Sequence, residues 1–485
     1  GKPYIDLYDV PPPGYLYLIS TFVKMFGLSI VTFRILHYAV SILAGTFLIL
    51  IINKSIKNIY LRLISWISLC LILFSKMVQT DMASIDITGL MFSLIGFYII
   101  LSVKNEIYKI GMSTAFFIMA TLTKEIYVFS IITVIIELII LHYKSKSDYS
   151  FIINQTKAAL IAFIPIGLIS YYLYAINSFS GFLSITADKQ ILVQNGSVFL
   201  LFKNLYSNFT RFIDKYFEFP NFLTLLIITL VIINLFYLIK TLKSKSNNKN
   251  VSTKYSSYIK TAIYAFTLFI GYFFYGQFTF DVRQIPFITG LILIITLITD
   301  YHFDALSSFK YNIVTKTIVI LIFGLSIYPS SFILNSYKEN STVYRDYSFE
   351  LNNYIKDRVE SNKCILHIYG WEVGPTYIYT ERKPCTKYFL TNLLMIITSK
   401  KDEFRQEIVN NPAAAIIYSI HFSDTNIEYY DENIFDFTSV VKNCYTPDPK
   451  YINYTNYFPG KVTLYWPKGN LTEKEMKDCI KSNGF

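Results

Sequence analysis

Long apolar segments separated by short polar loops fill the chain up to about residue 335. Residues 14–27 are apolar but are interrupted by Lys24 and end at Gly27, which is short for a membrane span and predicts a helix along the membrane surface. The segments that follow each approach the roughly 17–25 residues that a bilayer requires. They predict ten transmembrane helices, at about 31–53, 59–76, 84–103, 107–122, 124–143, 157–176, 221–240, 259–277, 284–302 and 312–334.

The loops between these segments differ in charge. Most basic residues fall in alternate loops, at Lys54, Lys57, Arg62, Lys104, Lys109, Lys144, Lys146, Lys240, Lys243, Lys245, Lys249, Lys254, Lys260, Lys310 and Lys316. The short loops of the other set hold little more than Lys76, Lys124 and Arg283. Because cytoplasmic loops carry the excess of Lys and Arg, the first set is predicted to be cytoplasmic. The opening loop, residues 177–220 and everything after about residue 335 are then predicted to face outward.

The chain changes character after about residue 335. Charged residues become frequent there, and the runs CILHIYG and AAAIIYS are typical of buried strands, whereas YRDYSFELNNYIKDRV and KKDEFRQEIV are typical of amphipathic helices. We therefore expect an all-α multipass membrane bundle of about ten helices over residues 1–335. A small outward-facing α/β domain is expected to follow over residues 336–485.

Four of the five cysteines lie in this predicted outward domain, at Cys364, Cys385, Cys444 and Cys479. An outward compartment can be oxidising, so disulfides among them are one interpretation, and isolated buried thiols are the other. Four cysteines allow three pairings, and their spacings favour none of these and match no zinc pattern. The five histidines are scattered. The sequence therefore predicts no metal site and no bound cofactor, and it leaves the participation of a divalent metal open.

The overall composition agrees with a membrane protein. Hydrophobic residues make up 53% of the 485 residues, and charged residues only 16%. The net charge of +11 is compatible with a nucleic-acid partner, but the lysines gather in short loops between apolar segments. Membrane topology explains that distribution better, so no nucleic-acid partner is predicted. The sequence has no glycine-rich phosphate loop, which argues against direct use of nucleotide sugars.

Charged residues also stand at the predicted outer ends of the spans: Asp6, Asp9, Lys76, Asp81, Asp86, Lys124, Glu125, Asp281 and Arg283. Charges at a span end cost desolvation energy and are often functional. We expect these residues to converge on one outward cavity below the C-terminal domain. The other interpretation is that they are solvated loop residues that set the span boundaries. The cytoplasmic ends are expected to lack comparable acid–base pairs close to the spans.

Such a cavity favours chemistry that involves a phosphate. Lys and Arg bind phosphate oxygens through charge-assisted hydrogen bonds. A carboxylate nearby can act as a general base on an acceptor hydroxyl. A polyprenyl-phosphate sugar fits these features, because its tail lies in lipid, its phosphate meets the bases and its sugar faces the acid.

The opening stretch GKPYIDLYDVPPPGYLYLISTFVKMFGLS resembles the first outward loop of GT-C glycosyltransferases of the protein-mannosyltransferase and aminoarabinose-transferase type. It shares their glycine, Tyr-x-Asp, proline pair and arginine-bearing next span, here Gly1, Tyr4, Asp6, Pro12, Pro13 and Arg34. TDMASIDITGL is similar to the family's acidic residue that opens a later span, ATLTKEIYVFS to its lysine between two spans, and FDVRQIPF to its outward arginine before a proline. CILHIYGWEVGPTYIYTERKPCTKYF is similar to a strand and Gly-x-x-Pro-x-Tyr stretch in the outward domain of many members.

The resemblance implies an inverting hexosyl- or pentosyltransferase that moves a sugar from a polyprenyl-phosphate donor to a lipid, glycan or protein acceptor outside the cytoplasm. It implies catalytic roles for Asp6 and Asp9, for which hydrogen bonds within a turn are the other interpretation. Substrate binding is implied for Tyr4, Asp81, Asp86, Lys124 and Arg283. The family's main catalytic acid and first span are expected upstream of Gly1. Val10 and Pro11 stand where related enzymes often have a lysine, so Lys124 and Arg283 are the better phosphate ligands.

A multipass transporter or lipid flippase is the main alternative. It would show paired inverted repeats and spans broken by Gly or Pro at corresponding positions, and neither is clear in the sequence. It also gives no reason for an outward α/β domain. A non-catalytic membrane scaffold is the third interpretation, and it predicts that Asp81, Asp86, Lys124 and Arg283 share no cavity.

Overall fold

The structure is a computed structural model. It describes residues 13–27, 30–73, 85–145, 149–180, 252–275, single positions between 286 and 300, and then 347–368, 376–377, 380–386, 401–420, 437–452, 454–457, 460–469 and 471–483. These residues fall into two compact units. The described residues of 13–172 and 252–300 belong to a helical unit, and those of 347–483 belong to an α/β unit.

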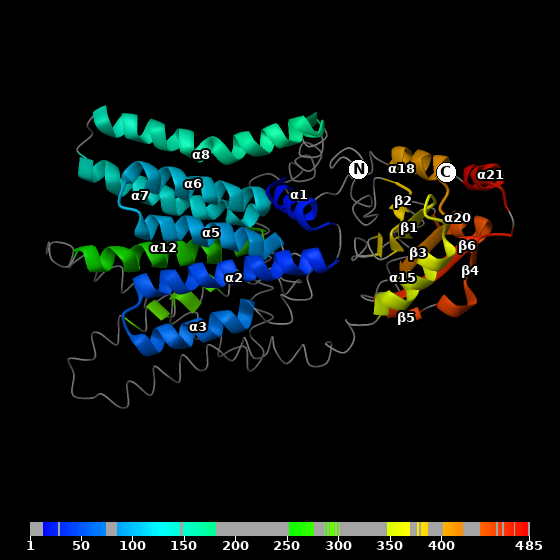
Figure 1. Ribbon diagram of the computed structural model, residues 1–485, viewed down its shortest axis with the longest axis horizontal. Helices are drawn as coiled ribbons and strands as arrows, with labels where there is room; N and C mark the ends of the chain where they lie inside the picture. The colour runs from blue at the N-terminus through cyan, green and yellow to red at the C-terminus, as the bar shows by residue number, and fades with distance from the viewer. Residues whose placement is uncertain are drawn as a thin grey trace. The chain divides into compact units, whose positions relative to one another are not determined.

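The helical unit is a bundle of apolar helices. Its elements are α1 (Pro13–Phe26), α2 (Ile30–Ser55), α3 (Ile59–Leu73), α5 (Ile85–Ser102), α6 (Glu106–Thr123), the 3₁₀ helix η1 (Glu125–Ser130), α7 (Ile131–Ser145), α8 (Tyr149–Ala175) and α12 (Ser252–Tyr275). The long helices run roughly parallel to one another (Figure 1), and α5 packs against both α2 and α6. Gly96 of α5 allows this close approach, because a Cβ there would lie 3.0 Å from the Ser113 carbonyl oxygen of α6.

Three of the described helices contain stretches long and apolar enough to cross a membrane: Val31–Ser55, Ile85–Ser102 and Phe151–Ala175. The outer surface of α8 agrees with this, because large apolar side chains such as Leu160 (70% exposed) and Ile164 (54% exposed) are uncovered there. Hydrocarbon suits such a surface better than water does. These are the features of an integral membrane protein. The count of ten spans stays a prediction, since residues 221–240 and 312–334 lie outside the described part of the chain.

The prediction of one continuous span over 124–143 is wrong at its start. Lys124 has an extended backbone, with φ −154° and ψ 124°, and the 3₁₀ helix η1 separates it from α7. An apolar run shows which residues avoid water but not where the backbone changes form. The surface helix expected over 14–27 is α1, which begins one residue earlier and ends before Gly27, whose φ of +80° suits a glycine at a helix end.

The strands that the structure describes form one six-stranded sheet in the α/β unit. They are β1 (Cys364–Ile368), β2 (Lys383–Pro384), β3 (Ala415–Ile420), β4 (Tyr445–Pro447), β5 (Tyr454–Tyr457) and β6 (Gly460–Pro467). Their order is β2-β1-β3-β6-β4, with β5 also paired to β6. β1 runs parallel to β2 and β3, whereas β6 runs antiparallel to β3, β4 and β5. The two runs predicted as buried strands form β1 and β3.

The helices of this unit are α15 (Tyr347–Arg358), α18 (Lys401–Asn410), α20 (Phe437–Cys444), the 3₁₀ helix η4 (Pro449–Tyr451) and α21 (Glu473–Ser482). α15, α20 and η4 contact strands of the sheet, and α21 packs on α18 and α20. The two segments predicted as amphipathic helices form α15 and α18. Leu351 and Ile355 of α15 share a core with Ile365, Ile417 and Leu464 of the sheet. The predicted domain boundary near residue 335 lies outside the described residues.

Two disulfides cross-link the α/β unit, Cys364–Cys385 and Cys444–Cys479. Their Cα atoms are 4.9 and 5.9 Å apart, within the usual range for a disulfide. The first ties β1 to the residue after β2, and the second ties the end of α20 to α21. The structure therefore selects one of the three pairings, and the interpretation of these four cysteines as isolated thiols is wrong.

Candidate active site

Asp86 stands in the first turn of α5, where it is only 7% exposed. A carboxylate is favoured at this place, because the amino end of a helix is the positive end of its dipole. Burial of a charged group within an apolar segment is nevertheless costly, and such groups usually serve a function. Asp86 is therefore a candidate for contact with a substrate.

Lys124 stands at the junction of α6 and η1. Its backbone N–H donates to the Ala120 carbonyl at 2.8 Å, which closes the last turn of α6. Its side chain is half-buried and lies at the negative end of the α6 dipole, where a cation is favoured. The extended backbone at this residue turns the chain toward Tyr127. A half-buried lysine at this junction suits contact with an anionic substrate group.

Gly89 and Tyr127 join these two positions. Tyr127 is buried, and its hydroxyl donates to the Asp86 carbonyl oxygen at 2.6 Å. The tyrosine ring covers Gly89 so closely that a Cβ at residue 89 would overlap it, and the same Cβ would lie 3.4 Å from the Lys124 Cβ. Asp86 and Lys124 therefore lie at the same end of the bundle, on either side of one contact between α5 and η1.

The start of α1 lies at this end too. Pro13, Gly14 and Tyr15 are buried. A Cβ on Gly14 would lie 3.0 Å from the Leu122 backbone and from the Thr123 Oγ1, immediately before Lys124. Glycine at this position lets the start of α1 pack against the end of α6. The described part of the candidate site thus draws on α1, α5, α6 and η1.

The structure describes only two of the predicted site residues, Asp86 and Lys124, and it brings these two together. The others lie outside the described residues: Tyr4, Asp6, Asp9, Asp81 and Arg283. Their convergence on one outward cavity stays a prediction. Among the described residues, no group of three or more His, Cys, Asp or Glu side chains could hold a metal ion.

A buried charge cluster lies at the opposite end of the bundle, where α6 begins. Glu137 of α7 pairs with Lys109 of α6 at 3.2 Å and with Lys260 of α12 at 2.7 Å. The expectation that the ends predicted to be cytoplasmic lack acid–base pairs close to the spans is therefore wrong. The pairing escaped sequence reasoning because each partner comes from a different helix. A single acid inside the apolar run IITVIIELIILHY is the signal that could have found it.

Asp300 forms a second buried cluster at that end. It accepts hydrogen bonds from the backbone N–H groups of Lys57 at 3.0 Å and Asn58 at 2.9 Å, and from the Tyr258 hydroxyl. These bonds hold the turn between α2 and α3 against α12. Buried charge alone therefore does not distinguish the two ends of this bundle. The case for a site at the Asp86 end depends on which groups meet there.

Comparison with known proteins gives a distant structural likeness. No family model and no curated protein sequence matches the chain. Two solved structures of ArnT from Cupriavidus metallidurans are similar at 11% sequence identity, each over 94% of this chain and 87% of that protein. The apo structure gives a TM-score of 0.46, and the structure bound to undecaprenyl phosphate gives 0.49. This degree of likeness assigns the chain to no family.

Proposed function

We propose that this protein transfers a sugar from a polyprenyl-phosphate-linked donor to an acceptor outside the cytoplasm, as a glycosyltransferase of the GT-C type. The observation that carries the proposal is the meeting of Asp86, Lys124 and the start of α1 at one end of the bundle. Each of the three comes from a segment that resembles a motif of that family. The sequence alone points to each of these segments, so their proximity in the structure is independent support for the proposal.

In the proposed reaction, Lys124 and Arg283 hold the donor phosphate by charge-assisted hydrogen bonds. An acceptor hydroxyl attacks the anomeric carbon on the face opposite the phosphate, and a carboxylate takes the hydroxyl proton. The bond from the anomeric carbon to the phosphate oxygen breaks, and its electron pair leaves with the polyprenyl phosphate. Asp6 or Asp9 is the proposed base, while Tyr4, Asp81 and Asp86 position the sugar or the acceptor.

The α/β unit is proposed to lie on the same outward side as this site. Its two disulfides support that placement, because disulfides persist in oxidising compartments and are rare in the cytosol. The lysine-rich loops of the helical unit point to the same sidedness. An outward domain is well placed to present a glycan, lipid or protein acceptor.

Transfer assays on the full-length protein in proteoliposomes test the proposal. The donors are radiolabelled polyprenyl-phosphate hexoses and pentoses, and the acceptor is an envelope extract. Lys124→Ala and Arg283→Ala are each expected to lower kcat/KM about 100-fold through loss of a charged hydrogen bond. Lys104→Ala, an exposed lysine at the other end of α5, is the matched control. Transfer that survives both Lys124→Ala and Arg283→Ala unchanged would refute the assignment of the site.

One observation favours a transporter as the second candidate. The buried Glu137 with Lys109 and Lys260 is the kind of intramembrane charge cluster that marks ion and proton pathways. A transporter predicts that Glu137→Gln abolishes movement of lipid or solute across proteoliposome membranes. The transferase predicts that the same variant, once folded, keeps sugar transfer to a donor supplied on the outer side.

A further inference from the structure

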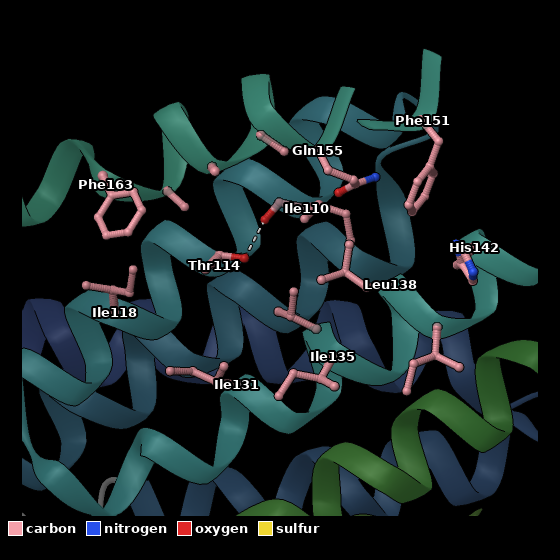
Figure 2. A pocket seen from close by; sticks show the side chains of 15 residues that line it. Ile110, Thr114, Ile118, Ile131, Ile135, Leu138, His142, Phe151, Gln155 and Phe163 are labelled. Carbon is pink, nitrogen blue, oxygen red and sulfur yellow. Dashed lines mark hydrogen bonds between the residues drawn. The ribbon is translucent and has the colours of Figure 1, made fainter. Parts of the chain in front are cut away.

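An open groove runs along the outside of the bundle between α6, α7 and α8, with a volume of about 750 Å³. Its walls are almost entirely apolar, and Figure 2 shows Ile118, Ile131, Ile135 and Leu138 pointing into it. The hydroxyl of Thr114, which also lines it, donates to the Ile110 carbonyl of its own helix at 2.7 Å. Most of the groove therefore offers a ligand only hydrocarbon contacts.

Polar side chains stand at one end of the groove. Figure 2 shows Gln155 and His142 beside Phe151 at that end, while Phe163 and Ile118 lie at the other. The lining residues of α7 lie between Ile131 and His142, a distance of about 16 Å along the helix. A groove with polar residues at one end and an apolar channel of this length matches a membrane lipid, which has a polar head group and an acyl chain.

The groove opens onto the surface that faces hydrocarbon. Ile135 and Ile139 in its wall are each 49% exposed, and Leu160 on the neighbouring outer face of α8 is 70% exposed. Alanines at 158, 159 and 162 of α8 provide the space, because longer side chains there would fill it. An apolar channel offers water almost no hydrogen bonds, whereas a lipid chain from the adjoining bilayer can enter it from the side.

The positive charge of the sequence around the polar end favours an anionic head group. The segment from His142 to Lys157 contains three lysines and one aspartate, a formal excess of two positive charges. Gln155 and His142 can both donate hydrogen bonds to a phosphate oxygen. Basic pockets between membrane helices on the cytoplasmic side bind anionic lipid head groups in this manner.

The polar end of the groove lies far from the candidate active site, although its apolar end, at Ile118 and Ile131, comes nearer. Lys124 ends α6, whereas Ile110 in the groove wall stands fourteen residues earlier, about 21 Å along the helix. A donor whose phosphate is bound at Lys124 would place its head group at the end of α6 remote from His142 and Gln155. The groove therefore suits a lipid whose head group lies in the leaflet opposite to the one that holds a donor phosphate at Lys124.

We propose that the groove binds an anionic phospholipid of the leaflet at the Lys109 end, with one acyl chain along α6, α7 and α8 and its phosphate at His142 and Gln155. The proposal is independent of the sugar-transfer function. In this proposal a phospholipid stays bound in the groove of the folded protein, and His142 and Gln155 bind its phosphate. A polyprenyl phosphate as the occupant would contradict it.

Native mass spectrometry of the full chain released from nanodiscs of mixed phosphatidylglycerol and phosphatidylcholine tests the proposal. The wild type is expected to retain one phosphatidylglycerol. Ala159→Trp fills the groove and is expected to lower the retained fraction at least about tenfold. Leu160→Trp adds the same side chain on the outer face of α8 and is expected to change nothing. Equal retention by the wild type and a folded Ala159→Trp protein would overturn the proposal.

A second variant keeps the test decisive if Ala159→Trp does not fold. Gln155→Leu leaves the channel open and removes a donor at its polar end, so the preference for phosphatidylglycerol over phosphatidylcholine is expected to fall several-fold. Thr156→Leu, an exposed neighbour outside the groove, is the matched control. An unchanged preference in Gln155→Leu, or polyprenyl phosphate as the lipid retained from native membranes, contradicts the proposal.

Discussion

Tyr127 fills the space that a side chain at residue 89 would need, and its hydroxyl donates to the Asp86 carbonyl. The ring thereby fixes the first turn of α5 against the junction that carries Lys124. Both contacts are made to the backbone of α5, whereas the proposed reaction uses the side chains of Asp86 and Lys124. Gly89 and Tyr127 are positioning residues, and a change at either is expected to move the two substrate ligands relative to one another.

Gly89→Ala is expected to displace the Tyr127 ring at a cost of about 1–3 kcal/mol and to lower kcat/KM for sugar transfer. Gly167→Ala in α8 is the neutral control, because a Cβ there meets nothing within 4 Å. Gly96→Ala is the packing control, because it crowds Ser113 and Phe117 in the middle of α5. Thermal unfolding and transfer are measured on all three. Equal losses of transfer in Gly89→Ala and Gly96→Ala at equal stability would rule out a positioning role.

Asp448 of the α/β unit accepts hydrogen bonds from the Trp466 Nε1 at 2.7 Å, the Tyr354 hydroxyl at 2.9 Å and the Lys450 N–H at 2.9 Å. Burial opposes the charged carboxylate, but these donors outweigh burial and hold the pKa of Asp448 below its usual value. Its contribution to the free energy of unfolding is therefore fully present above the unfolded-state pKa of about 3.9. It is lost as the pH falls through the lower folded-state pKa.

Asp448→Asn is expected to lower the free energy of unfolding of the α/β unit at pH 7 by about 2 kcal/mol and to flatten its decline in acid. Denaturant titrations of the full-length protein from pH 7 down to acid pH, followed by tryptophan fluorescence, measure both effects. Asp402→Asn changes an exposed aspartate of α18 and is the control. Acid profiles of the same shape in Asp448→Asn and wild type would contradict the prediction.

At the scale of helices and strands, apolar run length located α2, α5 and α6 to within two residues. It predicts starts for α8 and α12 that are several residues too late. The first turns of α12 are polar, and in α8 the polar residues Asn154, Gln155 and Lys157 interrupt the apolar pattern after Phe151. The candidate site was predictable only in part. Charge at span ends indicated Asp86 and Lys124, whereas the roles of Gly14, Gly89 and Tyr127 depend on contacts between segments far apart in sequence.

The three-helix ion cluster is a further element that sequence could not assemble. Glu137→Ala leaves Lys109 and Lys260 facing one another without their counter-charge, so it is expected to destabilise the bundle by about 3–5 kcal/mol. Thermal unfolding in detergent measures the loss, with the exposed Glu106→Ala at the same end as the control. The double variant Glu137→Ala and Lys260→Met is expected to recover part of it. Equal unfolding temperatures for Glu137→Ala and Glu106→Ala would show that the cluster contributes nothing.

For the whole molecule, the proposed sidedness puts the lysine-rich loops and the disulfides on opposite faces of the membrane. Intact cells that express a Cys70→Ser background are treated with a membrane-impermeant phosphine and then with an impermeant maleimide. The cysteines of the α/β unit are expected to react without permeabilisation, because their disulfides face outward. A control cysteine at Lys104→Cys, in the same background with the four paired cysteines replaced by serine, is expected to react only after permeabilisation. If labelling of the α/β unit requires permeabilisation, the unit faces the cytoplasm and the proposed topology is wrong.

A double-mutant cycle across Asp86 and Lys124 is the most direct test that these two residues serve one substrate site. kcat/KM for transfer from the polyprenyl-phosphate sugar is measured for the wild type, Asp86→Asn, Lys124→Ala and the double variant. Two residues that act on one bound substrate are energetically coupled. We therefore predict that the loss of transition-state stabilisation in the double variant is smaller than the sum of the two single losses by about 0.5–3 kcal/mol. Losses that add to within about 0.5 kcal/mol would contradict a shared site.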